Sequence, residues 1–208
     1  MARVSGPLHS DAASGKFAGS VVYSTWKGRP YARQLVTPGN PKSAKQVGVR
    51  AMMAFLAAQW KAKSLPKWTG WAAAATARGI STFNAFAGEC LARWQLFLGP
   101  TQVYPAAETS TPLSVSTQTL TGAAGFASIE VTPSGATNAW GIAIFRDTAE
   151  ITVPSWANCI AVIAADGANA VTYVDAPLEA GTYHYRTAVL NDDGVIGTVK
   201  ADDTVVVS

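Results

Sequence analysis

The stretch PTQVYPAAETSTP (residues 100–112) separates two parts of this sequence that differ in character. It is rich in proline, serine and threonine, which are typical of a linker between domains. Residues before it show the periodicity of helices, and residues after it form short alternating runs. We therefore expect a linker at 100–112, with a separately folded module on each side.

Charge changes sign across the same stretch. Residues 1–112 hold 13 Lys and Arg against 3 Asp and Glu, a net charge of +10, whereas residues 113–208 hold 3 against 10, a net charge of −7. A basic block favours an anionic partner, which could be nucleic acid, acidic lipid or an acidic protein surface. The sequence has no run of about 18 apolar residues and no signal-peptide core at its start, so we expect no membrane partner and synthesis in a cytoplasm.

The N-terminal side predicts a flexible arm at 1–14 and, at 15–99, an anchoring module that begins with a β-hairpin. The hairpin is expected over residues 17–36, which alternate around the dipeptide Lys27-Gly28. The glycine accepts the positive φ of a two-residue turn. Pro30 lacks an N–H donor, so we expect the second strand to be an edge there.

Three helices are expected to complete the anchoring module. Ser43 and Gln46 form a capping-box signature for the first helix. A second stripe of this helix, Arg50, Ala54, Ala57 and Lys61, suits contact with a partner or a neighbouring helix. The second helix is expected from Leu65-Pro66 to Gly79, and the third from Ser81 or Thr82 to Gly99. Tryptophans 60, 68, 71 and 94 lie on apolar stripes, which favours core packing over a ligand cage.

Residues 113–208 contain seven strand-like runs separated by turn residues, a spacing that predicts a β-sandwich. The expected fold class is therefore α+β and multi-domain. A β-hairpin plus three-helix module would be followed by an all-β sandwich.

The segment GTYHYRTAVLNDDG (181–194) resembles the penultimate strand of fibronectin type III domains. The resemblance covers residues 113–208 and implies that the sandwich is immunoglobulin- or fibronectin III-like. It also implies that Tyr183 is the tyrosine-corner residue, with the loop before the last strand at 191–194. Trp140 is similar to the tryptophan on the third strand of immunoglobulin-like folds. Alternation would turn Tyr183, Tyr185, Thr187 and Val189 to the same side.

Residues 15–98 contain, in order, GKFAGSVVYSTWKGRPYARQ, NPKSAKQVGVR, two expected Trp-bearing helices and FNAF. This order resembles an uncharacterised family of tailed-phage and prophage proteins. The resemblance implies a virion structural protein, such as a capsid decoration, head–tail neck or tail protein. Its expected location is the virion, and its expected partners are other virion proteins and copies of itself.

The sequence argues against an enzyme. Its histidines are His9, in the expected arm, and His184, which should point outward from a strand. No triad or metal-ligand spacing is evident, and Cys90 and Cys159 sit among apolar residues as expected for buried thiols. We expect no catalytic residues, no cofactor and no metal.

The candidate interface residues are basic and aromatic side chains of the hairpin and the first helix. They are Tyr23, Trp26, Lys27, Arg29, Tyr31, Arg33, Arg50 and Lys61. In the preferred interpretation they contact other virion proteins, with at most weak, non-specific contact to nucleic acid. The alternative is a nucleic-acid-binding protein in which the hairpin aromatics stack on bases and the cations meet phosphates. A third possibility is that Tyr23 and Trp26 pack on the helices while the cations face water.

Overall fold

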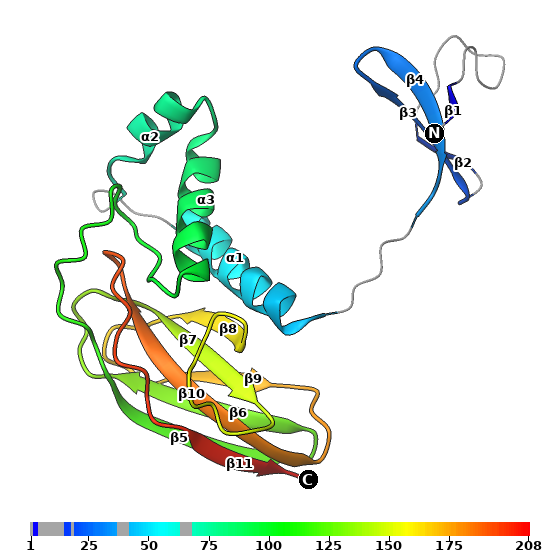
Figure 1. The fold of residues 1–208 in the computed structure, drawn as a ribbon. Helices are drawn as coiled ribbons and strands as arrows, with labels where there is room; N and C mark the ends of the chain where they lie inside the picture. The colour runs from blue at the N-terminus through cyan, green and yellow to red at the C-terminus, as the bar shows by residue number, and fades with distance from the viewer. Residues whose placement is uncertain (1, 4–14, 18, 37–41, 63–67) are drawn as a thin grey trace. The chain divides into compact units, whose positions relative to one another are not determined.

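The structure, a computed structural model, describes residues 2–3, 15–17, 19–36, 42–62 and 68–208 (Figure 1). The chain divides into two compact units, Met1–Pro41 (unit 1) and Lys42–Ser208 (unit 2). Most of the expected arm, with His9, and the expected helix start at Leu65-Pro66 lie outside the described residues.

Unit 1 contains a four-stranded antiparallel sheet with the strand order β1-β4-β3-β2. Its strands are β1 (Ala2–Arg3), β2 (Gly15–Phe17), β3 (Val21–Trp26) and β4 (Arg29–Gln34). Lys27 and Gly28 join β3 to β4 with φ angles of 49° and 74°, which confirms the predicted two-residue turn.

Strand β4 is an edge at Pro30, as the sequence predicted, because among the described residues Pro30 pairs only with Thr25 of β3. Its residues Tyr31 and Ala32 pair with β3 on one side and with β1 on the other. Proline removes only its own N–H donor, so the residues that follow Pro30 remain able to pair on both sides.

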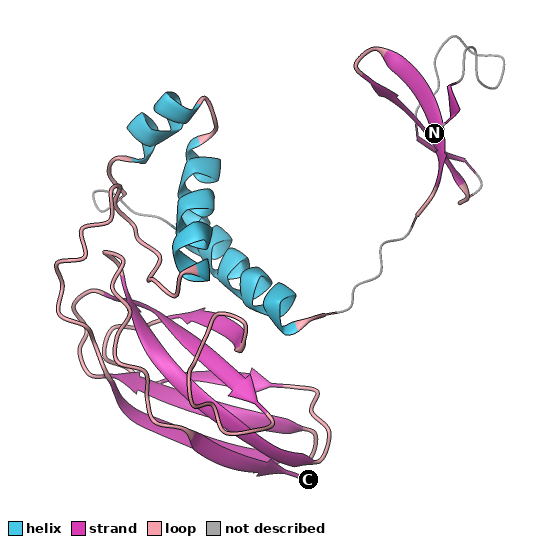
Figure 2. Ribbon diagram, in the orientation of Figure 1, coloured by secondary structure: helices cyan, strands magenta, loops and turns pink. Residues whose placement is uncertain are grey.

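Unit 2 is an α+β structure with three helices and seven strands within its described residues (Figure 2). The helices are α1 (Ala44–Ala62), α2 (Trp71–Arg78) and α3 (Thr82–Gln95). The strands form two antiparallel sheets, β5-β6-β9 and β11-β10-β7-β8. Their bounds are β5 (Val115–Ala123), β6 (Phe126–Pro133), β7 (Ala139–Asp147), β8 (Cys159–Ala164), β9 (Val171–Asp175), β10 (Gly181–Asn191) and β11 (Asp203–Val207).

Local sequence signals explain where two of these helices begin and end. Ser81 caps α3, because its hydroxyl oxygen accepts a hydrogen bond of 3.2 Å from the Asn84 N–H. Gly79 ends α2 in the left-handed conformation, with φ of 65°. Helix α3 stops at Gln95, four residues before the predicted Gly99.

The two sheets share one apolar core. It contains Val115, Ala127, Ile129, Val131, Ile142, Ile144, Ala161, Tyr185, Val189, Val205 and Val207. Tyr185 and Val189 of β10 both belong to it, and Tyr183 packs against it, as the two-residue period of that strand predicted.

A second core joins the helices to the outer face of the four-stranded sheet β11-β10-β7-β8. The Phe55 ring of α1 lies 5.1 Å from the Trp140 ring of β7, and the Trp94 ring of α3 stacks at 6.3 Å on Phe145 of β7. Trp140 therefore faces the helices rather than the core between the sheets, where an immunoglobulin-type tryptophan would lie. Figure 2 shows the helices together on one side of the sheets.

Residues 100–112 are hydrogen-bonded both to the helices before them and to the β-rich part after them, so they do not separate the two parts as a free linker would. The carbonyl of Gln102 accepts a hydrogen bond of 2.7 Å from the Trp71 indole of α2. The N–H groups of Thr109 and Ser110 donate to Asp193, in the loop after β10, at 2.9 and 2.8 Å. The structure thus divides the chain after residue 41, and not at 100–112 where the sequence suggested a linker.

The change of charge falls inside unit 2. Residues 1–41 hold 5 Lys and Arg and 1 acidic residue, a net charge of +4, whereas residues 42–208 hold 11 against 12, a net charge of −1. A basic residue of the helices is paired with acceptors in the segments that follow them: Arg93 of α3 forms an ion pair with Glu108 and donates a hydrogen bond to the carbonyl of Gly194. The positive charge of residues 42–112 and the negative charge of residues 113–208 therefore nearly cancel within unit 2.

Candidate functional site

Strand register sorts the side chains of unit 1 onto two faces. Residues opposite one another in adjacent strands point to the same side of a sheet. Arg33 is opposite Val22, which is opposite Lys16; Tyr31 is opposite Ser24; and Arg29 is opposite Trp26. One side, called the basic face here, therefore carries Lys16, Val22, Ser24, Trp26, Arg29, Tyr31 and Arg33.

The other side of the sheet carries no charged side chain among the described residues. This uncharged face contains Val21, Tyr23, Thr25, Pro30, Ala32 and Gln34. Tyr23 thus lies on the opposite face from Trp26, as alternation along the strand predicts, and also from Tyr31, although all three belong to the candidate set.

No described side chain of unit 1 is buried. Val21, Tyr23, Tyr31 and Ala32 are half-buried, and Trp26 is 65% exposed. An exposed tryptophan of this size is available to a partner, because little of its apolar area has been removed from water.

The hairpin tip combines cations with the exposed aromatic ring. The ammonium of Lys27 lies over the Trp26 ring, 4.8 Å from its centroid, a cation–π contact. Residues 15–36 include Lys16, Lys27, Arg29 and Arg33 and no acidic residue. The tip and the basic face together therefore present positive charge with no acidic group in that segment to offset it.

Arg50 and Lys61 belong to unit 2 and are not part of this face. Both lie on α1, where the second stripe, which also includes Ala54 and Ala57, is exposed. The candidate residues thus fall into two groups: one on the sheet of unit 1, the other on α1.

The thiols of unit 2 are poorly suited to chemistry. Cys90 and Cys159 are free and buried, which confirms the prediction. Burial raises the pKa of each to about 12, so both are protonated at neutral pH. A protonated thiol is a weak nucleophile, and we assign neither residue a catalytic role.

His184 is paired and mostly covered, rather than a free surface residue as expected. Its Nδ1 lies 2.6 Å from the Asp202 carboxylate, and 20% of its side chain is exposed. Asp202 also accepts from the Ile151 N–H at 3.3 Å, so this carboxylate fixes the segment between β7 and β8. Within the described ranges, no three His, Cys, Asp or Glu side chains are grouped so that they could hold a metal ion.

A polar network that the sequence did not reveal connects the two sheets of unit 2. Asp175 of β9 accepts hydrogen bonds from Arg146 of β7 at 2.7 Å and from the Tyr185 hydroxyl of β10 at 2.8 Å. Burial, together with this hydrogen bond to Asp175, raises the pKa of Tyr185. The three residues lie 10 or more positions apart in pairs, so no local motif marks them.

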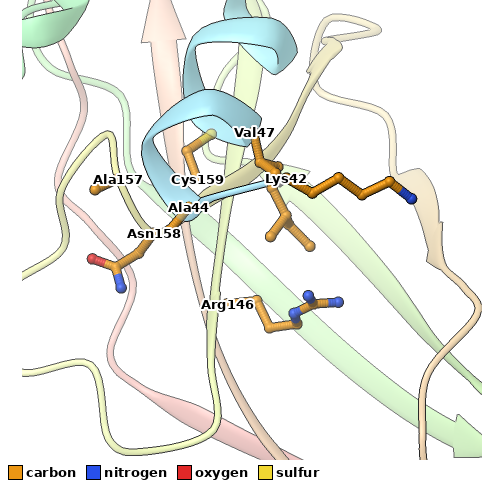
Figure 3. Close-up of a pocket in the computed structure, with 8 residues that line it drawn as sticks. Lys42, Ala44, Val47, Arg146, Ala157, Asn158 and Cys159 are labelled. Atoms are coloured by element: carbon orange, nitrogen blue, oxygen red, sulfur yellow. The ribbon is translucent and has the colours of Figure 1, made fainter. Parts of the chain in front are cut away.

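A small cavity of about 200 Å³ lies where α1 begins, next to β7 and β8 (Figure 3). Lys42, Val47, Arg146 and Cys159 are among its lining residues. The Arg146 guanidinium is already paired with Asp175, and the Cys159 thiol is protonated. The cavity therefore offers positive charge but none of the paired acid and base groups that catalysis needs.

The basic face of unit 1 is thus the strongest candidate functional surface of the described chain. None of the described helices is long and apolar enough to cross a lipid bilayer. The chain matches no protein-family model, and no curated protein is significantly similar to it.

Proposed function

We propose that this protein is a non-enzymatic structural component of a tailed-phage particle, attached through unit 1. The observation that carries the proposal is a four-stranded sheet in which no described side chain is buried. Small sheets need a covered apolar face to be stable in water. Binding to a partner would supply that cover.

The uncharged face of unit 1 suits attachment to protein. Val21, Tyr23, Pro30 and Ala32 are all half-buried, so each has apolar area still to bury. Such area stabilises a complex by roughly 25 cal/mol per Å² removed from water, before the costs of association. The partners proposed are other virion proteins and neighbouring copies of this chain, in a capsid decoration, a head–tail neck or a tail.

For the part of unit 2 that follows the helices we propose a fibronectin III-like domain, displayed by the attached protein. The sheets β5-β6-β9 and β11-β10-β7-β8 divide seven strands three to four. The Tyr183 hydroxyl donates a hydrogen bond of 3.0 Å to the carbonyl of Glu179, four residues upstream. A tyrosine at the start of the penultimate strand that bonds back in this way is a hallmark of such folds.

The direct test is the protein content of purified particles from the strain that encodes the gene. Quantitative mass spectrometry should find the protein in virions, in about six or twelve copies for a ring component or in hundreds for a decoration protein. Abundant protein in the infected cell with none in the particle would contradict the proposal.

Attachment through the uncharged face has its own test. The substitution Ala32→Glu places a charge on that face, and its matched control Ser24→Glu places one on the basic face, in the adjacent strand. Only Ala32→Glu should abolish incorporation, because an unpaired carboxylate cannot be buried against an apolar partner. Equal incorporation of the two variants would mean that the protein attaches through a surface other than the uncharged face.

A further inference from the structure

We propose that the basic face of unit 1 binds single-stranded nucleic acid. This inference does not depend on the structural role proposed above, because that role uses the opposite face of the sheet. It depends on which side chains the strand register brings to one side.

The cations of the basic face are spread over neighbouring strands. Lys16 and Arg33 lie in one row, on either side of Val22. Adjacent strands are about 4.8 Å apart, which places the backbones of Lys16 and Arg33 ~10 Å from each other. Arg29 and Arg33 are four residues apart on β4, or about 13 Å. Such spacing suits contact with several phosphates along one strand, rather than with a single small anion.

Aromatic side chains lie between these cations. Along β4 the basic face reads Arg29, Tyr31, Arg33, and Trp26 is opposite Arg29 on β3. Trp26 remains 65% exposed although Lys27 lies over its ring. Alternating cations and exposed rings provide phosphate contacts and base stacking together.

Stacking decides between a single strand and a duplex. Bases of a duplex are stacked on one another, so an aromatic side chain reaches them only after they unstack, at a cost of a few kcal/mol. Bases of a single strand are free to stack on protein rings. An acidic protein surface could pair with the same cations. It would bury the aromatic rings only as apolar area, whereas nucleic-acid bases also stack on their planar faces. The combination therefore favours a single strand.

The test is fluorescence anisotropy with the full chain, a labelled oligothymidylate of about 20 nucleotides and a duplex of equal length, between about 50 and 200 mM salt. We expect the single strand to bind about 10-fold more tightly than the duplex. For three or four phosphate contacts, the slope of log K against log salt should be about −2 to −3.

Two variants separate the contributions of charge and stacking. Arg29→Gln with Arg33→Gln should reduce the magnitude of the slope by about 1.4, since each contact with a single strand contributes about 0.7. Trp26→Ala should weaken binding about 10-fold and leave the slope unchanged, as loss of one stacking platform predicts. Lys42→Gln with Lys45→Gln is the matched control, because it removes two exposed charges at the N-terminal end of α1 and should change the affinity less than 2-fold.

Several results would overturn the proposal. They are duplex binding as tight as that of the single strand, an equal loss of affinity in the α1 control, or no effect of Trp26→Ala in a variant whose circular dichroism spectrum is unchanged. Each of these results would mean that the basic face attracts any polyanion or acidic protein through its charge alone. Incorporation into particles is a separate measurement, so failure of one proposal does not imply failure of the other.

Discussion

The indole Nε1 of Trp140 on β7 donates a hydrogen bond of 2.8 Å to the Gln59 side chain of α1, 81 residues earlier in the chain. The Trp140 ring also lies 5.1 Å from Phe55 and 5.9 Å from Trp68. One strand residue thus contacts the helical layer through both a hydrogen bond and aromatic packing. The helices and the sheet cover each other's apolar surfaces, so neither is complete alone.

Unit 2 is therefore expected to unfold in one cooperative transition. Trp140→Ala should destabilise helices and strands together, by about 3–5 kcal/mol, because it removes a buried ring shared by both layers. Thermal unfolding followed by far-UV circular dichroism and by tryptophan fluorescence should give coincident midpoints, shifted equally in the variant. Separate transitions for the helical and β parts would contradict this expectation.

Two helical glycines should respond in opposite directions to substitution by alanine. A Cβ on Gly48 of α1 would lie 1.9 Å from the Trp156 carbonyl oxygen, so Gly48→Ala should force α1 away from the sheet and cost at least about 2 kcal/mol. Gly88 of α3 is exposed, and its Cβ would meet nothing within 4 Å. Gly88→Ala should stabilise by about 0.5–1 kcal/mol through helix propensity. Denaturant titration measures the free energy of unfolding of both variants. Equal effects would mean that α1 does not lie against the loop that contains Trp156.

Asp193 makes the stability of unit 2 depend on pH. Burial alone would raise the pKa of this carboxyl, but hydrogen bonds from Ser110, Val195 and Thr109 outweigh it and hold the pKa below its ordinary value. The contribution of Asp193 to the stability of unit 2 is therefore fully present above the pKa that this carboxyl has in the unfolded chain. It is lost as pH falls through the lower pKa that the carboxyl has in the folded state.

Asp193→Asn should remove this dependence. The variant should lose about 1–3 kcal/mol at neutral pH, because the donors at Thr109 and Ser110 lose a charged acceptor. As pH falls through the lowered pKa of the folded state, the difference between variant and parent should shrink, since both then carry an uncharged side chain. Urea titrations across this range measure the change, and a difference that stays constant with pH would contradict the assignment.

Two tyrosines two residues apart on β10 should differ in their response to loss of the hydroxyl. Tyr183→Phe removes an exposed bond to the Glu179 carbonyl and should cost about 0.5–1.5 kcal/mol. Tyr185→Phe removes a buried donor to Asp175 and should cost more, about 2–3 kcal/mol. Chemical denaturation of both variants measures the difference. The reverse order would mean that the Asp175 network does not stabilise the contact between the sheets.

Signals carried by a few neighbouring residues predicted much of the local structure. Lys27-Gly28 predicted the hairpin turn, Ser81 the start of α3, and Gly79 the end of α2. Each works through the backbone conformation or hydrogen bonds of residues within four positions, so no distant contact is needed.

The candidate surface was only partly predictable. The sequence identified the basic and aromatic residues of the hairpin, but it listed Tyr23 with Trp26 in one candidate set and added Arg50 and Lys61 of α1 to it. Alternation along a strand already puts Tyr23 and Trp26 on opposite faces, because they are an odd number of positions apart. Only the register shows which residues of β2 and β4 share each face. Asp175 and Asp193 gave no signal, since their partners lie far away in the sequence.

Strand β7 shows most clearly what the tertiary structure added. Its run AWGIAIF is apolar at successive positions, and Trp140 to Phe145 are all buried. A strand with one face in water would alternate, so the sequence by itself carries the information that both faces of β7 are covered, although the expectation of alternating sandwich strands did not use it. Only the tertiary structure decided that α1 and α3 provide the second cover, and that residues 42–208 form one unit instead of two. The physical reason is that apolar burial is non-directional: a sequence shows which surfaces must leave water, but the complementary shapes of distant elements decide which surfaces meet.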